Sequence, residues 1–123
     1  MHLEENRKWN VKNPHQGDWK KVLCVCSAGL LRSPTAALVL SQPPFNFNTR
    51  SCGLIADYAI IVLDGILLEW ADEVVCMDDT QAREIQKRTQ KPVITLHIPD
   101  HYGYRDKELI SLIKERYKQN GPS

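Results

Sequence analysis

The chain has 123 residues, which is enough for one domain with its own core and too few for two. Hydrophobic residues make up 42% of the sequence and charged residues 25%, an ordinary globular balance. The formal net charge of +1 gives no bulk attraction to nucleic acid or to a membrane surface, so any preference for anions must be local. No apolar run approaches the roughly 18 residues of a membrane span.

The N-terminal sequence and the cysteines indicate the compartment. Residues 1–8 are rich in charge and lack the apolar core of a signal peptide. Three of the four cysteines lie in apolar runs, and Cys24 and Cys26 lack the second Cys/His cluster that a zinc site needs. We therefore expect a cytoplasmic protein with reduced thiols, and neither nucleic acid nor membrane as a partner.

The polar start of the chain differs from the rest. Residues 1–20 are interrupted by Pro14 and Gly17, so we expect an irregular N-terminal arm there. We expect residues 21–118 to form the folded domain and residues 119–123 to form a flexible tail.

Four apolar runs are typical of strands. The run at Lys21–Cys26 is apolar almost throughout, as expected for a parallel strand that is covered on both faces. The other three predicted strands span residues 46–52, 73–77 and 93–98. A helical pattern follows each strand, and the four predicted helices span residues 33–41, 60–70, 78–89 and 106–118.

This alternation predicts a single α/β domain with a four-stranded parallel sheet and helices on both faces. In the helix predicted at 60–70, a buried stripe is expected from Leu63, Ile66, Leu67 and Trp70. Ligands of such sheets bind at the carboxyl ends of the strands. Cys26 and the loop at 99–104 both follow strands, so we expect them at the same edge of the sheet.

The segment from Cys26 to Pro34 follows the first predicted strand and opens the first predicted helix. It has the pattern Cys-x5-Arg-Ser-Pro. A tight turn at a helix N-terminus gathers backbone N–H groups into an anion site. A thiol beside such a site ionises easily, because the helix dipole and the neighbouring Arg32 favour the thiolate. The segment therefore predicts a cysteine nucleophile that faces a bound phosphate.

Each part of this loop suits that chemistry. Arg32 offers a planar fork to two phosphate oxygens, which a lysine does not match. Ser33 caps the helix and donates a hydrogen bond to the sulfur of Cys26, which makes the sulfur a better leaving group. Backbone N–H groups along the loop are expected to surround the phosphate; they belong to Ser27, Ala28, Gly29, Leu30, Leu31 and Arg32.

The loop resembles that of the low-molecular-weight protein tyrosine phosphatases, especially their short bacterial and phage branch. Three further segments are similar to that family: Arg50-Ser51-Cys52-Gly53, the strand ending in Val74-Val75-Cys76-Met77, and Pro99-Asp100-His101-Tyr102-Gly103. The similarity covers roughly residues 20–118. It implies a four-stranded parallel sheet, a cysteinyl-phosphate intermediate, and no metal or other cofactor. The implied partner is a phosphorylated substrate, with a phosphotyrosine protein favoured.

The general acid has two candidates. Asp100 aligns with the family's acidic loop, although its proline precedes the acid here instead of following it. Asp106 is the competitor, and its position also suits the cap of the last helix. We favour Asp100 as the acid and Asp106 as the cap.

Three other residues have two interpretations each. Ser51 resembles the family's serine that hydrogen-bonds the phosphate loop, or it is a plain hydroxyl at a strand end. Tyr102 and Tyr104 form the aromatic wall of a phosphotyrosine slot, or they only pack. We expect Cys24 to point to the opposite face of its strand from Cys26 and to belong to the core.

The loop also departs from the family. Gly29 replaces the usual asparagine, so the support of the loop must come from elsewhere. Leu30-Leu31 stands where relatives often have a second cysteine, which removes an in-loop disulfide as redox protection.

Three functions compete. The leading one is a metal-independent phosphomonoester hydrolase. A thiol-dependent arsenate reductase would need a further pair of resolving cysteines, and only Cys52 and Cys76 remain, both in predicted strands. A phosphate-binding adaptor without catalysis has no need of a thiol at Cys26. We therefore favour the hydrolase.

Overall fold

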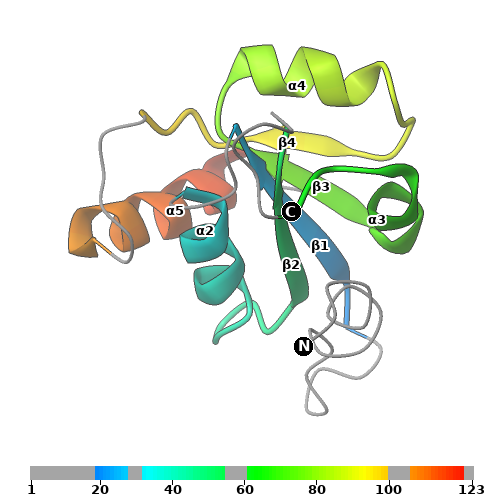
Figure 1. Cartoon of the computed structure of the whole chain (residues 1–123). Coiled ribbons are helices and arrows are strands. Elements are labelled where there is room, and N and C mark those ends of the chain that lie inside the picture. The colour runs from blue at the N-terminus through cyan, green and yellow to red at the C-terminus, as the bar shows by residue number, and fades with distance from the viewer. Residues whose placement is uncertain (1–18, 28–31, 55–60, 100–105, 121–123) are drawn as a thin grey trace.

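A parallel four-stranded sheet forms the centre of the molecule (Figure 1). The computed structural model describes residues 19–27, 32–54, 61–99 and 106–120. Its strands lie in the order β2-β1-β3-β4, and every neighbouring pair is parallel. The strands are β1 (Lys21–Cys26), β2 (Asn48–Gly53), β3 (Glu73–Cys76) and β4 (Val93–Thr95). The sheet predicted from the sequence is therefore confirmed.

Two helices cover each face of this sheet. The helices are α2 (Arg32–Leu40), α3 (Gly65–Trp70), α4 (Asp79–Gln86) and α5 (Lys107–Asn120). Figure 1 shows α2 and α5 together on one side of the sheet. The helices α3 and α4 pack on the other side. The chain steps from β1 to β2 in one direction and then returns past β1 to β3, so the order of strands reverses between β1 and β3. Ligands bind at such a point in open α/β sheets.

Two separate cores follow from this arrangement, because side chains alternate between the faces along each strand. One core lies under α2 and α5, where Val22, Cys24 and Cys26 of β1 meet Leu109 and Ile113 of α5. The other lies under α3 and α4, where Leu23 and Val25 of β1 meet Leu67, Leu68 and Ile85. The strand β1 is therefore buried on both faces, as its nearly continuous apolar sequence predicts.

The segment predicted as a helix over 60–70 is partly extended. Val62 forms an isolated parallel bridge to Gly53, and α3 begins only at Gly65, where the Asp64 side chain accepts a hydrogen bond from the Leu67 N–H. The predicted stripe is therefore partly wrong: Ile66 is 47% exposed, whereas Leu68 is 7% exposed and lies in the core. Periodicity alone does not show that the end of β2 holds Val62 in a parallel bridge ahead of the helix.

Other element boundaries differ by a few residues. The strand β4 ends at Thr95 instead of 98, and α5 continues to Asn120, beyond the predicted end at 118. Residues 119 and 120 of the predicted tail are therefore helical, while residues 121–123 of that tail and residues 1–18 of the predicted arm at 1–20 lie outside the described residues. The proposed division of the chain into arm, domain and tail stays a prediction.

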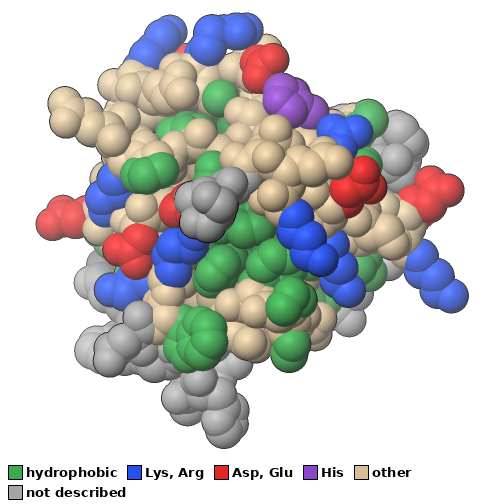
Figure 2. All heavy atoms as spheres, turned by 180° about the vertical axis from the view of Figure 1, so that it is seen from behind, with side chains coloured by type: hydrophobic (Ala, Val, Ile, Leu, Met, Phe, Trp, Pro, Cys, Tyr) green, Lys and Arg blue, Asp and Glu red, His purple; other side chains and the backbone are tan. Residues whose placement is uncertain are grey.

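Figure 2 shows the face opposite to that of Figure 1. Apolar side chains gather near its middle, and lysines, arginines and acidic side chains are scattered around them. This mixture agrees with the formal net charge of +1. Among the residues that the structure describes, no helix is both long and apolar enough to cross a membrane.

Candidate active site

Cys26 is the last residue of β1, at the carboxyl edge of the sheet and at the reversal of strand order. Its side chain is 3% exposed. On one side it pairs with Gly53 of β2, and its carbonyl accepts a hydrogen bond from the Leu54 N–H at 3.0 Å. The backbone of the residue predicted to be the nucleophile is therefore held against the end of β2.

Ser33 contacts the sulfur of Cys26. The Cys26 thiol donates to Ser33 Oγ at 3.2 Å, and the Ser33 hydroxyl donates to the carbonyl of Cys52 at 3.3 Å. Ser33 is the second residue of α2 and is fully buried. Its hydroxyl contacts the Cys26 thiol and the Cys52 carbonyl, so the prediction that Ser33 caps the helix is wrong. If Cys26 loses its proton, the hydroxyl can turn and donate to the sulfur, because a serine hydroxyl rotates freely.

Arg32 begins α2 and is 5% exposed. Its Nη1 donates to the carbonyl of Ile98 at 2.8 Å. Ile98 in turn donates its N–H to the carbonyl of Met77, at the end of β3. The arginine expected to bind phosphate is therefore tied to the segment that leads from β4 toward Asp100.

Cys24 lies on the same face of β1 as Cys26, and the expected orientation was wrong. Residues two apart in a strand share a face, and both thiols belong to the core under α2 and α5. The expectation that Cys24 is a core residue is confirmed, since it is fully buried. Burial raises the pKa of the Cys24 thiol well above its usual value, and the neighbouring Cys52, Glu73 and Cys26 add to this rise.

Cys76 is also protected from ionisation. Burial raises the pKa of its thiol to about 11, and a hydrogen-bond contact with Thr95 Oγ1 at 3.6 Å partly offsets the rise. All four cysteines are free thiols. Cys24 and Cys76 therefore lack the chemistry of a nucleophile at neutral pH.

Several predicted site residues lie outside the described part of the chain. They are Ala28, Gly29, Leu30 and Leu31 of the loop, the proposed acid Asp100, and Tyr102 and Tyr104. Their roles stay predictions. Ser51 is described: it is half-buried in β2 and pairs with Cys24 in the sheet register. Its predicted hydrogen bond to the phosphate loop stays a prediction as well.

Asp106 caps the last helix. It lies just before α5, and its Oδ1 accepts a hydrogen bond from the Glu108 N–H at 2.8 Å. This is the contact of a helix N-cap. The position that we assigned to Asp106 in the sequence is therefore observed.

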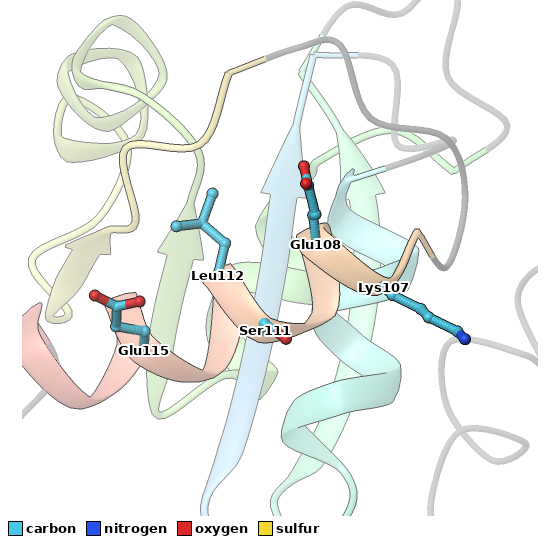
Figure 3. A pocket seen from close by; sticks show the side chains of 5 residues that line it. All are labelled: Lys107, Glu108, Ser111, Leu112 and Glu115. Atoms are coloured by element: carbon cyan, nitrogen blue, oxygen red, sulfur yellow. The ribbon is translucent and has the colours of Figure 1, made fainter.

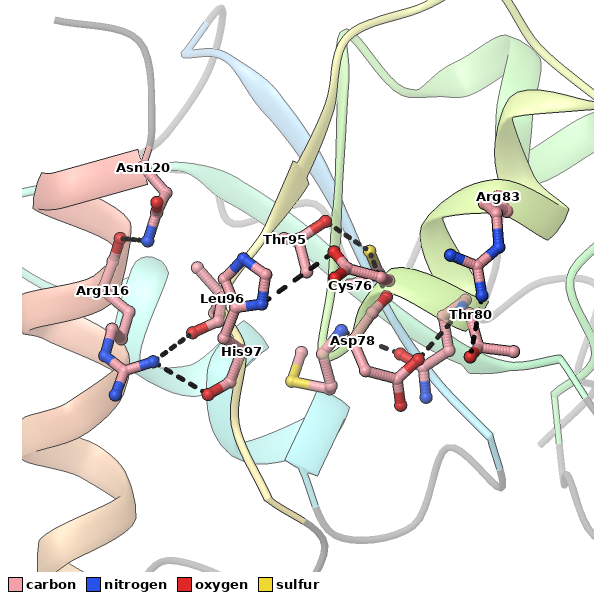
Figure 4. A network of polar contacts seen from close by, with 12 residues as sticks. Cys76, Asp78, Thr80, Arg83, Thr95, Leu96, His97, Arg116 and Asn120 are labelled. Carbon is pink, nitrogen blue, oxygen red and sulfur yellow. Dashed lines mark hydrogen bonds and ion pairs between the residues drawn. The ribbon is translucent and has the colours of Figure 1, made fainter.

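The segment between β4 and Asp100 is held by α5 (Figure 4). Arg116 donates from Nη1 to the carbonyl of Leu96 at 3.1 Å and to that of His97 at 2.8 Å. His97 has a φ of 56°, which is uncommon for a residue with a side chain. Its Nδ1 lies 3.9 Å from Asp79 Oδ1 on α4. Sequence reasoning did not find Arg116, because no local pattern marks a side chain that binds distant carbonyls.

Gln81 is the other residue that sequence reasoning missed. It lies in the first turn of α4 and is 3% exposed. Its Nε2 donates to Ser27 Oγ at 3.2 Å, and its Oε1 accepts from the Met77 N–H at 2.8 Å. The spacing Asp78-x-x-Gln81 is that of a helix cap and could have been noticed. The hydrogen bond from Gln81 to Ser27 could not be predicted from the sequence, because the two residues are 54 positions apart.

A shallow hollow of about 400 Å³ lies elsewhere, along α5. Its lining residues are Lys107, Glu108, Ser111, Leu112 and Glu115 (Figure 3). None of the predicted site residues lines it. The chemistry of the Cys26 loop therefore identifies the candidate site better than this hollow does.

Solved structures share the fold of this chain. Wzb from Vibrio vulnificus, in complex with benzylphosphonate, has a TM-score of 0.65 and 20% sequence identity, covering 82% of this chain and 96% of its own. The low-molecular-weight phosphotyrosine phosphatase from Vibrio cholerae O395 has a TM-score of 0.60 and 18% identity, covering 79% and 91%. The chain has the fold of the low-molecular-weight phosphatases. The fold implied by the sequence resemblance is thereby confirmed.

Another solved structure with a similar fold is that of an arginine phosphatase. The YwlE arginine phosphatase from Geobacillus stearothermophilus has a TM-score of 0.59 and 19% identity, covering 80% of this chain and 86% of its own. No protein-family model matches the sequence, and no curated protein matches it either. At these identities the comparisons establish the fold, and the activity must be argued from the residues.

Proposed function

We propose that this protein is a metal-independent phosphomonoester hydrolase that works through a cysteinyl-phosphate intermediate. One observation carries the proposal: Cys26 ends β1 at the reversal of strand order, with Ser33 Oγ 3.2 Å from its sulfur and Arg32 buried at the start of α2. Each group suits one need of the reaction. A phosphate monoester requires a nucleophile, donors for its oxygens and a proton for the leaving group.

In the first step, the Cys26 thiolate attacks phosphorus. An S–P bond forms while the bond from phosphorus to the ester oxygen breaks, and Asp100 gives its proton to that oxygen. Arg32 and the loop amides hold the three remaining phosphate oxygens and balance their charge. We propose that no metal is needed, because these donors already supply that balance.

In the second step, water attacks the phosphorus of the cysteinyl-phosphate. Asp100, now a carboxylate, takes the proton of the water, and the S–P bond breaks. Cys26 leaves as a thiolate, which the Ser33 hydroxyl stabilises from 3.2 Å after turning toward the sulfur. Inorganic phosphate then departs and the starting state returns.

The test compares hydrolysis of p-nitrophenyl phosphate by the wild type and by Cys26→Ser. We expect steady turnover by the wild type and a loss of at least about a thousandfold in kcat for Cys26→Ser, with the melting temperature retained. Cys76→Ser serves as the control, because it changes a thiol that has a pKa of about 11 and leaves the proposed machinery intact. Turnover that survives in Cys26→Ser would contradict the nucleophile.

For the substrate we propose a phosphotyrosine protein, with Tyr102 and Tyr104 lining the slot. The fold is shared with phosphotyrosine phosphatases and also with an arginine phosphatase, so the second substrate is a defined alternative. Peptides that carry phosphotyrosine and phosphoarginine at the same position distinguish them by kcat/KM. We expect the phosphotyrosine peptide to be preferred. The reverse preference would overturn the substrate and leave the hydrolase intact.

We also propose the cytoplasm as the compartment. All four thiols are free, which fits a reducing environment. A cysteine nucleophile requires such an environment, because oxidation of Cys26 would stop the first step.

A further inference from the structure

We infer that Gln81 is a positioning residue for the phosphate loop, holding Ser27 from the first turn of α4. This inference rests on the proposed function for its catalytic consequence. Gln81 lies at the reversal of strand order, where α4 follows β3 and the loop follows β1. A difference between this sequence and the family that it resembles also points to Gln81. Gly29 stands where that family usually has an asparagine in the loop, so the loop requires support from a residue outside it.

The amide of Gln81 is held at both ends. Its side-chain Oε1 accepts from the Met77 N–H at 2.8 Å, and the backbone N–H of Gln81 donates to the capping carboxylate Asp78 Oδ1 at 2.9 Å. The first contact orients the side chain and the second fixes the backbone from which it projects; the residue is 3% exposed. Its Nε2 then donates to Ser27 Oγ at 3.2 Å. Hydrogen bonds in such a chain polarise one another, so the donor that faces Ser27 is strengthened.

A glutamine at position 81, instead of a glutamate, distinguishes a helix cap from a donor to the phosphate loop. A helix cap of this spacing accepts glutamate as readily as glutamine, because only the acceptor oxygen is used. A glutamate would keep the contact to Met77. It would lack the N–H that reaches Ser27, and it would place a negative charge beside a site for an anion. The cap alone therefore does not require an amide at position 81, whereas the phosphate loop does.

Ser27 connects the hydrogen bond from Gln81 to the site where phosphate is expected to bind. It is the residue directly after Cys26, and its backbone N–H is one of the donors expected around the phosphate. A side chain anchored to α4 limits the rotation of this first loop residue. Preorganised donors stabilise charge without paying for reorganisation during the reaction. Loss of the anchor is therefore expected to weaken anion binding without removing the nucleophile.

The test uses Gln81→Glu and, as a matched control, Gln86→Glu. Both variants add one negative charge to α4, but Gln86 is exposed at the end of the helix. Two quantities are measured: the inhibition constant of inorganic phosphate, and the ratio of the alkylation rates of Cys26 by iodoacetate and iodoacetamide. The first reagent is an anion and the second is neutral, so the ratio reports the anion site without any hydrolysis.

We expect Gln81→Glu to raise the inhibition constant and to lower the alkylation ratio by about tenfold, while the variant still unfolds in one cooperative transition. We expect Gln86→Glu to resemble the wild type in both. The inference is overturned if Gln81→Glu also resembles the wild type, or if both variants shift equally.

A second pair of variants tests whether Gln81 acts through Ser27. The neutral Gln81→Met is compared in the wild-type and Ser27→Ala backgrounds. We expect it to weaken phosphate binding by about 3- to 10-fold in the first and by much less in the second. Equal losses in both backgrounds would refute positioning through Ser27. If the wild type hydrolyses no phosphate ester while the alkylation ratio still responds to Gln81→Glu, the proposed function fails and this inference stands.

Discussion

At the scale of single residues, the mechanism that we propose reverses the direction of the contact between Ser33 and Cys26. In the structure the Cys26 thiol donates to Ser33 Oγ at 3.2 Å, and the hydroxyl donates to the Cys52 carbonyl. A thiolate has only acceptor capacity, so the hydroxyl would turn toward it. We therefore propose that the same contact stabilises the leaving thiolate in the second step.

This predicts the effect of Ser33→Ala. A hydrogen bond to a charged group contributes about 1.5–3 kcal/mol, so we expect kcat to fall by about 10- to 100-fold, and KM to fall with it because the phosphoenzyme accumulates. Release of phosphate from the enzyme slows most, and a burst of p-nitrophenol then precedes the steady state. Stopped-flow kinetics measures this burst. Ser41→Ala is the control, since the Ser41 hydroxyl donates to the Leu38 carbonyl just beyond the far end of α2. An equal loss in both variants would remove Ser33 from the mechanism.

At the scale of elements, the N-terminus of α5 separates the two candidate acids. Asp106 Oδ1 accepts from the Glu108 N–H and is therefore occupied as a cap. We predict that Asp106→Ala lowers the free energy of unfolding by about 0.5–2 kcal/mol and leaves the dependence of the rate on leaving-group pKa unchanged. Asp100→Asn should do the reverse, slowing esters with poor leaving groups most. Urea unfolding and a leaving-group series measure both. If Asp106→Ala alone steepens the leaving-group dependence, the acid is Asp106.

The C-terminus of α3 has a cap from a distant lysine. Lys91 Nζ donates to the carbonyls of Leu68 at 2.7 Å and Glu69 at 2.6 Å, and also to that of Ala71. These are carbonyls that a helix end leaves without partners. Lys91 therefore fastens the short helix α3 to the segment that enters β4.

We predict that Lys91→Met lowers the free energy of unfolding by about 1–3 kcal/mol, because it leaves these carbonyls without a charged donor. Lys87→Met is the matched control. Lys87 pairs with Glu84 on the exposed side of α4 at 3.5 Å, and an exposed pair of this kind contributes about 0–1 kcal/mol. Chemical denaturation measures both variants. Equal losses would show that the carbonyl contacts of Lys91 do not stabilise α3.

Local sequence signals predict the elements well and the contacts between them poorly. Some features depend on residues close together in the sequence and could be predicted from it. They are the strand Lys21–Cys26, the Cys-x5-Arg-Ser-Pro loop and the cap at Asp106. The prediction that Ile66 is buried was wrong, because Val62 forms a bridge to Gly53 at the end of the preceding strand and the helix begins only after it. Gln81, Arg116 and Lys91 were missed for the same reason, since each binds a group that only the fold brings near.

At the scale of the whole molecule, a buried polar cluster lies at the end of the sheet opposite the site. Glu73 opens β3 and is 2% exposed, and the Tyr117 hydroxyl of α5 donates to its Oε1 at 2.9 Å. Lys20, just before β1, pairs with the same carboxylate and lies 4.6 Å from the Phe47 ring centroid. The cluster joins the starts of two central strands to the end of the last helix, away from Cys26.

The buried thiols and this tyrosine predict a loss of stability at alkaline pH. Burial raises the pKa of Cys76 from 9.0 to about 11, and burial together with Glu73 raises that of Tyr117 above its usual value. In both cases the folded state keeps its proton while the unfolded chain releases it. The stabilisation is complete below pH 9 and is lost as pH rises through the folded-state values.

For Cys76 we expect a loss of about 2–3 kcal/mol in the free energy of unfolding between pH 9 and 11. Unfolding curves in urea across this range measure the slope. Cys76→Ala should flatten the slope, because alanine does not titrate. A slope that is identical in Cys76→Ala would show that this thiol does not couple to folding.

The proposed mechanism transfers the phosphoryl group to the sulfur of Cys26. The most direct measurement is to quench the reaction with p-nitrophenyl phosphate rapidly in acid and to map the protein by mass spectrometry, using Ser33→Ala to slow the second step. We predict one phosphoryl group per chain, on the peptide that contains Cys26, and none in Cys26→Ser. A phosphoryl group on another residue, or steady turnover without any phosphorylated protein, would contradict it.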